Sequence, residues 1–433
     1  MTAVTDAGTG TPRVLASWYA TGRVDLEAHR ATHGSLPVPA KRDRGWADRF
    51  VQELADAGLT GRGGAGFPTA RKVGSLRAGR GHPLLVLNAM EGEPASHKDR
   101  ALVTSAPHLV LDGAELVATA IGAGAIAVCI ARERTEMVRG LRLALSQRRG
   151  PDVMTVPVEV LDPPGRFVAG EESALVHWIA GGQAKPTFRP ARGVPLSIGR
   201  RPALVHNPES LAHAALVARH GAAWFRAVGT SDAPGTALVT VTGTVGRPGV
   251  YEVPLGTPLS VILRQAGLSR PPGAVLLGGY GGAWIPPALL DTAYAPAPLA
   301  AVGGALGAGV IGVIPDSACG VAETARIVAY LAAEGAGQCG PCVFGLPALA
   351  GDLAELARGA GTTATLARLR TRLGEVAGRG ACRHPDGAVR LVQSALGVFA
   401  SDLAAHARRR PCPGWNHRPV LAAPARGPGS PWR

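Results

Sequence analysis

Hydrophobic residues recur at two spacings along the chain. Over the first half, short apolar runs alternate with stretches in which apolar side chains return every three or four residues. The first pattern is typical of buried strands and the second of amphipathic helices. We expect strands at 83–88, 125–131 and 153–161, and helices at 107–120 and 133–146. This alternation predicts an α/β domain with βαβ units and a mainly parallel sheet.

The pattern changes near Pro234. Residues 237–243 alternate β-branched and small side chains, as a half-buried strand does. A turn at Gly246–Gly249 leads to a returning strand at Val250–Val253. Leu259, Ile262 and Leu263 then indicate a short helix. These features predict a second, small β domain.

From Val321 onward the pattern is helical. Four apolar stripes step by three and four residues and are joined by short polar loops, which predicts a four-helix bundle. The stripes are Val321, Ala325, Val328, Leu331; Leu346, Leu349, Leu353, Leu356; Leu366, Leu369, Leu373, Val376; and Val389, Val392, Leu396, Phe399, Leu403.

The two ends of the chain lack such periodicity. Residues 1–45 carry Gly, Pro, Thr and mixed charges, and predict a flexible lead-in. Residues 409–433 are rich in Pro, Arg and Gly, and predict a disordered basic tail. Between them we expect an α/β domain over 46–233, a β domain with its connection over 234–315, and the bundle over 316–408.

Composition narrows the class of protein. The 433 residues are 46% hydrophobic, which can fill more than one core. The net charge is +14, but aromatic residues make up only 4%, and no nucleic-acid-binding motif is present. No apolar run reaches the roughly 18–20 residues that cross a bilayer, and no signal peptide precedes the first domain. We therefore expect a cytoplasmic protein with no nucleic acid partner and no direct membrane insertion.

A glycine-rich stretch, Gly61–Gly66, carries the first candidate chemistry. Four glycines in six residues permit positive φ angles and let the backbone approach a ligand closely. A following helix would direct free N–H groups toward an anion, and Arg62 and Lys72 add positive charge. The spacing matches neither common nucleotide-binding fingerprint. The stretch is therefore either a phosphate-binding loop or an ordinary surface loop.

Two polar clusters follow strands. Asn88–Pro94 comes directly after the strand at 83–88, at the end of the sheet where α/β proteins bind ligands. Glu171 and Glu172 follow Gly170 at the start of a predicted helix, where carboxylates suit the helix dipole; the alternative is a plain helix N-terminus with no ligand.

The stretches GRGGAGFPTARKV and NAMEGEPASHKDR together resemble a known family. They are similar to GRGGAGFPTGxKW and NADEGEPGTFKDR of the FMN- and NADH-binding 51 kDa (F) subunit of NADH-quinone oxidoreductase, or respiratory complex I, a module also found in NAD-dependent hydrogenases and formate dehydrogenases. Residues 165–175, 185–190 and 205–211 resemble three further loops of that family. Residues 243–259 resemble its SLBB module, a small β-grasp domain, with Gly278–Gly282 in the place of the family's GGxS loop. The resemblance covers roughly residues 50–405.

This resemblance implies a Rossmann-like FMN-binding domain, an SLBB domain and an iron–sulfur bundle. It also implies that FMN takes electrons from NADH and passes them to the cluster. Glu93 would face the nicotinamide as the catalytic residue, and Phe67 would stack on it. The residues implied at the FMN phosphate and ring edge are Gly61, Arg62, Gly63, Gly64 and Lys72, and those around flavin and ribose are Asn88, Glu91, Gly170, Glu171, Glu172 and Asn207.

The chain departs from the family pattern at several of these loops. Met90 replaces an Asp, Phe167 a Tyr, Ala169 a Cys and His206 an Asn. Ser75 and Arg192 stand where two further aromatic residues would sandwich the nucleotide. Their loss predicts weaker binding of NADH by tens-fold or more, at about 1–3 kcal/mol for each stacking partner. Arg192 would favour a phosphate, such as the 2′-phosphate of NADPH.

Three cysteines, Cys339, Cys342 and Cys382, have the spacing of a metal site. A C-x2-C pair with a distant third thiol favours an iron–sulfur cluster or zinc. The family holds a [4Fe–4S] cluster with four cysteines, and Ala336 stands at the first position. The alternatives are a [4Fe–4S] cluster with a non-cysteine fourth ligand, a [3Fe–4S] cluster, or an empty site.

The remaining cysteines carry weaker expectations. Cys319 precedes the first bundle helix and would serve as a fourth cluster ligand only if it reached across about twenty residues. Cys129 lies in an apolar strand, where packing is the expected role. Cys412 lies in the predicted tail and is expected to be incidental.

The sequence therefore predicts an FMN- and iron–sulfur-dependent NAD(P)H oxidoreductase of the NADH dehydrogenase type. We expect NAD(H) or NADP(H) as the nucleotide and a ferredoxin-like or other iron–sulfur protein as the redox partner, attracted by the positive charge. Two alternatives remain. One is a non-catalytic scaffold or degenerate subunit of a redox complex, and the other a bundle stabilised by zinc on Cys339, Cys342 and Cys382.

Overall fold

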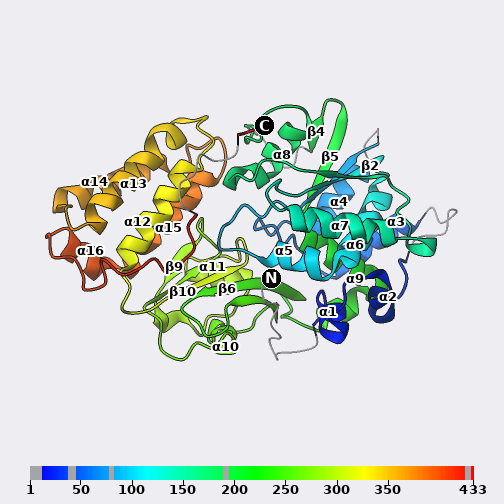
Figure 1. Ribbon diagram of the computed structural model, residues 1–433, viewed down its shortest axis with the longest axis horizontal. Helices are drawn as coiled ribbons and strands as arrows, with labels where there is room; N and C mark the ends of the chain where they lie inside the picture. The colour runs from blue at the N-terminus through cyan, green and yellow to red at the C-terminus, as the bar shows by residue number, and fades with distance from the viewer. Residues whose placement is uncertain (1–11, 38–44, 78–81, 189–194, 425–430) are drawn as a thin grey trace.

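Two five-stranded sheets and a helical bundle follow one another along the chain, as Figure 1 shows. The computed structural model describes residues 12–37, 45–77, 82–188, 195–424 and 431–433. The α/β domain lies on the right of the view, the second sheet below, and the bundle on the left. This order confirms the predicted fold class.

The first sheet has the order β3-β2-β1-β5-β4, and all neighbouring pairs are parallel except β4 with β5. The third strand is shorter than predicted, because a 3-10 turn and an irregular segment precede Val158. The strands are β1 (Leu84–Asn88), β2 (Ala125–Cys129), β3 (Val158–Leu161), β4 (Leu196–Ile198) and β5 (Arg201–His206).

Helices cover both faces of this sheet because both faces are apolar. Leu85 and Leu87 of β1 pack into the cluster formed by α3, α4, α6, α7 and α9, whereas Leu84 and Val86 pack against α8 on the opposite face. The helices are α3 (Trp46–Asp56), α4 (Thr69–Arg77), α5 (Lys98–Ser105), α6 (Pro107–Ile121), α7 (Thr135–Gln147), α8 (Glu172–Ile179) and α9 (Pro208–Arg226).

The strand order reverses at β1. The chain leaves β1 toward β2 on one side, and β5 returns on the other side of β1. In sheets of this type the crevice beyond the carboxyl ends of the two diverging strands is the usual ligand site. Here those ends are Asn88 and His206, which place the loops that follow them at one edge.

The second sheet has the order β7-β6-β10-β8-β9, with β6 and β10 parallel at its centre. One face packs against α10 and α11, and the other packs on the bundle through Leu276, Val310 and Ile314. Its elements are β6 (Thr236–Gly243), β7 (Gly249–Pro254), α10 (Leu259–Gln265), β8 (Ala274–Leu277), β9 (Ala283–Ile285), α11 (Pro296–Ala301) and β10 (Val310–Ile314).

The bundle follows the predicted stripes, except that the last stripe breaks at Phe399. The two helices on either side of this residue meet at an angle of 89°. Among the described residues, no single helix is long and apolar enough to span a membrane, and this bent pair meets the length and composition test only when joined. The helices are α12 (Gly320–Ala333), α13 (Leu346–Ala357), α14 (Thr363–Val376), α15 (His384–Val398) and α16 (Ala400–His406).

The expectation of a flexible lead-in over 1–45 is wrong for residues 12–37. This segment forms α1 (Ala16–Thr21) and α2 (Leu26–His33) and buries Val14 and Leu15 in the first core. The Glu252 carboxylate accepts the backbone N–H groups of Arg13, Val14 and Leu15 at 3.0–3.2 Å. Helices this short leave little periodic signal, and a contact across more than 230 residues leaves none.

The expectation of a disordered tail over 409–433 is wrong for the described residues of that segment. Leu421 is buried in the bundle core, and the Glu323 carboxylate accepts the backbone N–H of Val420 at 2.8 Å. The end of the chain returns to the α/β domain, where the Trp432 carbonyl accepts the Ala184 N–H at 2.8 Å. One apolar anchor and these backbone partners order a segment of otherwise disorder-prone composition.

A backbone contact between α6 and α9 yields a prediction about stability. A Cβ at Gly113 of α6 would lie 1.9 Å from the Leu211 carbonyl oxygen of α9. Gly113→Ala must therefore push α9 away from α6. We expect the free energy of unfolding, measured by chemical denaturation, to fall by about 1–3 kcal/mol. The matched control is Gly140→Ala on α7, where a Cβ meets nothing within 4 Å. That variant should be neutral or slightly stabilised, and equal effects of both changes would contradict the prediction.

Candidate functional site

The glycine stretch forms a closed loop that leads into α4. The Gly61 N–H donates to the Phe67 carbonyl at 2.8 Å, and the Thr69 N–H to the Leu59 carbonyl at 2.9 Å. Gly64 and Gly66 adopt φ angles of 100° and 62°, which other residues adopt only with strain. The loop therefore needs its glycines for its shape.

This loop lies against two other parts of the site. A Cβ on Gly63 would lie 3.5 Å from the Asn207 Cβ, so the loop sits beside the start of α9. A Cβ on Gly64 would lie 3.2 Å from the Gly307 carbonyl oxygen, so its tip also contacts the second domain. A cavity of about 220 Å³ opens there, lined by the loop, Lys98, Glu209, Tyr294 and the segment Gly304–Gly309.

The loop after β1 joins the loop before α8. The Asn88 side-chain amide donates to the Gly170 carbonyl at 2.8 Å. A Cβ on Gly92 would lie 2.5 Å from the Phe167 carbonyl oxygen, and one on Gly170 would lie 3.1 Å from the Met90 Cβ. The glycine loop, Asn88 and Gly170 thus converge at the reversal point of the sheet.

Arg62 is turned into the protein. Its guanidinium donates to the Thr236 carbonyl and the Thr60 hydroxyl, both at 3.1 Å, and its backbone N–H donates to the Ser210 hydroxyl at 2.8 Å. The side chain is buried, and burial lowers its pKa. Arg62 therefore anchors the base of the loop to β6 and α9, and does not point its charge into open space.

Lys98 is a buried cation that the sequence reasoning did not assign. Its ammonium lies 2.6 Å from Asp99 Oδ1, 2.9 Å from Glu209 Oε2 and 3.4 Å from Asn207 Oδ1. Burial opposes the charge, but the carboxylates of Asp99 and Glu209 raise the pKa of Lys98 above its ordinary value. The only available signal was its place in the KDR end of the second motif.

Glu91 and Glu171 act as helix caps. The Glu91 carboxylate accepts the backbone N–H groups of Asp99 at 2.8 Å and Arg100 at 3.2 Å, at the start of α5. Burial and the neighbouring Asp99 raise the pKa of Glu91. Glu171 accepts the N–H groups of Ser173 and Ala174 at the start of α8. Both carboxylates therefore shape the loops that surround the site.

Glu93 faces the second domain. Its carboxylate accepts the Tyr280 N–H at 2.8 Å and the Ala95 N–H at 3.3 Å. A Cβ on Gly279 would lie 2.6 Å from Glu93 Oε2, so the glycine permits this approach. Burial outweighs the two hydrogen bonds and raises the pKa of Glu93 to about 7. This carboxyl group exchanges a proton near neutral pH.

Three side chains of the site are partly exposed to solvent, namely those of Lys72, Glu172 and Phe67. The Lys72 ammonium pairs with the Glu172 carboxylate and donates to the Val205 carbonyl at 2.6 Å. Phe67 is 44% exposed, and the Arg71 guanidinium lies over its ring, 5.4 Å from the ring centroid. Asn207 caps α9 through the Glu209 N–H at 3.0 Å and donates to Asp99 Oδ2 at 2.6 Å.

Three buried polar atoms around the glycine loop have no hydrogen-bond partner within the described part of the chain. They are Thr69 Oγ1, His206 Nε2 and Arg62 Nε, the last of which still has a long ion pair with Glu209 Oε1 at 3.9 Å. Burial and the charge of Lys72 lower the pKa of His206 to about 3, so its imidazole is neutral. An unpaired buried polar atom costs about 1–3 kcal/mol. A polar ligand at the loop would relieve that cost, and the residues present therefore fit a phosphate-bearing cofactor.

Cys339, Cys342 and Cys382 gather at one end of the bundle. Cys339 precedes the π-helical turn Pro341–Gly345 that leads into α13, Cys342 lies within that turn, and Cys382 precedes α15. Burial and the thiols of Cys339 and Cys382 raise the pKa of Cys342 to about 12. An electropositive cluster would reverse that effect, because thiolate is the ligand form. Three converging thiols fit an iron–sulfur group.

The position of the missing ligand is filled by a buried alanine, Ala336. Cys319 does not substitute for it, because Cys319 caps the opposite end of α12. That helix has 14 residues, so the two ends are about 20 Å apart. His384, two residues after Cys382, has a buried Nδ1 with no partner among the residues described, while its Nε2 lies 2.8 Å from the Leu331 carbonyl oxygen.

The cysteine loop is tied to the loop before α8. The Glu334 carboxylate accepts the Phe167 N–H and the Arg166 Nε–H, both at 2.9 Å. The Phe167 ring packs on His384 with ring centroids 5.3 Å apart. The two candidate cofactor sites are therefore neighbours. Arg189, Pro190 and Arg192 of the third loop lie outside the described residues.

Comparison with known proteins gives three matching family models. Residues 54–215 match the Nuo51 FMN-binding domain, residues 238–277 the SLBB domain, and residues 322–406 the iron–sulfur binding region of NADH-ubiquinone oxidoreductase-F. The three matches follow one another in the order of the domains seen in the structure.

The chain is also similar to whole proteins. It is 31% identical to the F 2 subunit of NADH-quinone oxidoreductase in Rhizobium meliloti (strain 1021), covering 84% of this chain and 90% of that one. It is 30% identical to a NADP-reducing hydrogenase subunit of Solidesulfovibrio fructosivorans, covering 84% and 77%. The crystal structure of an air-oxidised NAD⁺-reducing [NiFe]-hydrogenase matches with a TM-score of 0.81 and 30% identity, covering 94% of this chain and 68% of that one.

The raised pKa of Glu93 yields a prediction about pH. The stability contributed by its protonated form is complete below pH 4.5 and is lost as the pH rises through about 7. Glu93→Gln removes this titration, so the variant should gain up to about 3 kcal/mol of unfolding free energy over the wild type between pH 4.5 and 8. Denaturation across that range checks this. The exposed Glu136→Gln serves as control, and parallel pH profiles for wild type and Glu93→Gln would contradict the assignment.

Proposed function

The chain belongs to the family of NADH-quinone oxidoreductase F subunits, which makes it an FMN- and iron–sulfur-dependent NAD(P)H oxidoreductase module, and we propose how its residues divide this work. The proposal rests on one observation. The glycine loop, Asn88 and Gly170 meet at the reversal point of the sheet, and Glu334 ties the loop beside Gly170 to the cysteines.

The glycine loop and the first turn of α4 hold the FMN phosphate. The Thr69 N–H is bonded to the Leu59 carbonyl, but the buried Thr69 hydroxyl has no partner among the described residues and would bind the phosphate, and Lys72 would supply the positive charge. To do so Lys72 exchanges its pairing with Glu172 for the phosphate. Asn88, Gly170 and Asn207 line the flavin and ribose, while Glu91 and Glu171 hold the surrounding backbone as helix caps.

The nicotinamide end lies between Phe67 and Glu93. The exposed Phe67 ring, which the Arg71 guanidinium also contacts, would provide a stacking face, and Glu93 keeps a carboxyl group that binds or releases a proton near neutral pH. FMN, when bound, takes two electrons from the reduced nicotinamide and releases them one at a time. The protein's own contribution is to position both rings and to hold Glu93 in a buried place through Tyr280 and Ala95.

The cluster is held by Cys339, Cys342 and Cys382. With Ala336 at the fourth position it is either a [3Fe–4S] cluster or a [4Fe–4S] cluster whose last iron takes another donor. We assign that place to the buried Nδ1 of His384, which has no partner among the described residues. The electrons then pass to an iron–sulfur partner protein, and the net charge of +14 favours an acidic one.

Cofactor content after anaerobic purification tests this division of roles. We expect flavin and iron in the wild type. Lys72→Gln should weaken FMN binding about 10- to 100-fold, because a charge-assisted contact is lost. Cys342→Ser should lose iron and keep FMN. Arg139→Gln, a change in an exposed surface pair, is the control for Lys72. Colourless protein without flavin or iron, or equal FMN affinity in Lys72→Gln and the control, would refute the assignment.

Nucleotide binding gives a separate prediction. Phe67→Ala should weaken NADH binding roughly 5- to 150-fold through loss of stacking, without loss of FMN. Ser75 lies exposed on α4 where the family has an aromatic residue, so Ser75→Phe should strengthen NADH binding by a similar factor. Spectrophotometric titration of the flavoprotein with NADH and with NADPH measures both. Unchanged affinity in both variants would exclude Phe67 and position 75 from the nucleotide site.

A further inference from the structure

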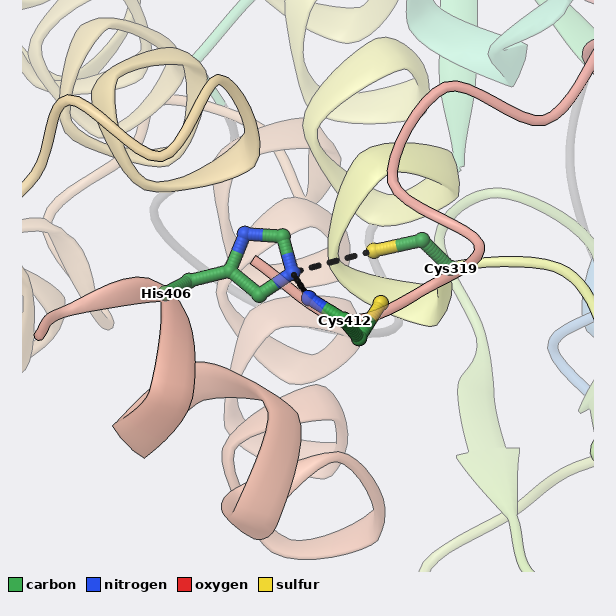
Figure 2. A group of neighbouring side chains, drawn as sticks. All are labelled: Cys319, His406 and Cys412. Atoms are coloured by element: carbon green, nitrogen blue, oxygen red, sulfur yellow. Dashed lines mark hydrogen bonds between the residues drawn. The ribbon is translucent and has the colours of Figure 1, made fainter. Parts of the chain in front are cut away.

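A second cluster of ligand-type side chains lies at the far end of α12. Cys319, His406 and Cys412 come from three separate segments: the start of α12, the end of α16 and the C-terminal segment (Figure 2). One ligand atom from each lies within 4.8 Å of the other two. Cys319 and His406 are buried, and Cys412 is half-buried.

The imidazole of His406 is fixed with one nitrogen toward the sulfur atoms. Its Nδ1 lies 2.8 Å from the Leu356 carbonyl oxygen, which can only accept, so Nδ1 carries the hydrogen. The lone pair of Nε2 therefore faces the cysteines. A histidine whose other nitrogen donates to a backbone carbonyl is the usual arrangement for a metal ligand.

Two donors already approach that lone pair. Cys319 Sγ lies 3.5 Å from His406 Nε2, and the Cys412 backbone N–H donates to the same atom at 3.2 Å, as the dashed lines in Figure 2 show. Two hydrogen-bond donors therefore approach the same lone pair of His406 Nε2. A metal cation bound to that nitrogen would occupy the same position.

The separation also suits a particular ion. In a tetrahedral zinc site, with Zn–S near 2.3 Å and Zn–N near 2.05 Å, sulfur and nitrogen are about 3.6 Å apart. The observed distance between Cys319 Sγ and His406 Nε2 is 3.5 Å. Cys412 lies on an irregular segment, and its sulfur lies within 4.8 Å of both other ligand atoms.

We propose that Cys319, His406 and Cys412 bind a zinc ion, separate from the iron–sulfur cysteines. Two thiolates and one imidazole are the donors that zinc prefers, and a water molecule completes the tetrahedron. Binding replaces the two thiol protons, which pass to solvent. Cys339 follows the opposite end of α12, about 20 Å away along the helix axis, so the two sites do not share ligands.

The zinc ion would fasten the C-terminal segment to the bundle. Beyond Cys412, the Leu421 carbonyl of that segment accepts a hydrogen bond from the Arg326 guanidinium at 2.7 Å. The Ala422 carbonyl accepts one from the Tyr280 hydroxyl. Tyr280 in turn donates its backbone N–H to Glu93. The metal would therefore stabilise the C-terminal segment, which contacts Tyr280 in the loop that faces Glu93.

Metal analysis of the full-length protein tests the proposal. After anaerobic purification with zinc in the medium, mass spectrometry of metals should find one zinc per chain in addition to iron. Cys412→Ser, at a half-buried position that should not disturb folding, should lose this zinc and retain iron and FMN. Cys129→Ser, a change of a buried cysteine on β2 that belongs to neither cysteine group, should retain zinc. Cobalt reconstitution should give thiolate charge-transfer absorption that Cys319→Ser and Cys412→Ser abolish.

Several outcomes would overturn the proposal. Wild-type protein without zinc, or equal zinc in Cys412→Ser and wild type, would exclude the site. Zinc that disappears in Cys342→Ser but stays in Cys412→Ser would place the ion on the cluster cysteines instead. A Cys319–Cys412 disulfide in the anaerobic protein, detected by thiol counting and peptide mass, would show a redox pair in place of a metal site.

Discussion

A buried group of charges at the start of α9 is the constraint on which the site depends. Lys98 is surrounded by the carboxylates of Asp99 and Glu209 and by the Asn207 amide, and the side chains of all three charged residues are at most 8% exposed. Removing one partner from such a group leaves an uncompensated buried charge, which commonly costs about 3–5 kcal/mol. The group therefore fixes the relative positions of the elements that carry it.

Those elements are the ones that form the proposed cofactor site. Glu209 accepts the backbone N–H of Leu238 at 2.8 Å, which joins α9 to the first strand of the second sheet. Asn207 lies beside Gly63 of the glycine loop. Glu91 caps the helix that presents Lys98 and Asp99. The electrostatic group thus connects the loops from both domains, and the glycines permit the close approaches that the connections require.

The sequence predicted most of the strands and helices that carry these loops, since the loops lie in long local motifs. The strand before Asn88, the helix after Glu171 and the four bundle stripes are each specified by residues near one another in the chain. What it missed depends on distant contacts. Cys319 and His406 are 87 residues apart and lie in no common motif, and Leu421 orders its segment through a core built from other helices. Lys98 was within a matched motif, but only the fold shows that its partners are Asp99 and Glu209.

Helix α12 relates the two ends of the bundle. Beyond its last turn, Glu334 holds the loop beside Gly170, so the cysteine loop lies next to the loops that we propose to bind flavin. At its first turn, Cys319 meets His406 and Cys412. The backbone hydrogen bonds of α12 allow little change in its length, so the helix holds its two ends at a fixed separation. In the proposed arrangement, the end of α12 near Glu334 would help to set the distance between the flavin and cluster sites, and the contacts of Cys319 lie at the other end. The alanine at position 336 does not change the contacts at this end of α12. Ala336 is buried, and the contacts with the loop beside Gly170 are made by the nearby Glu334 carboxylate.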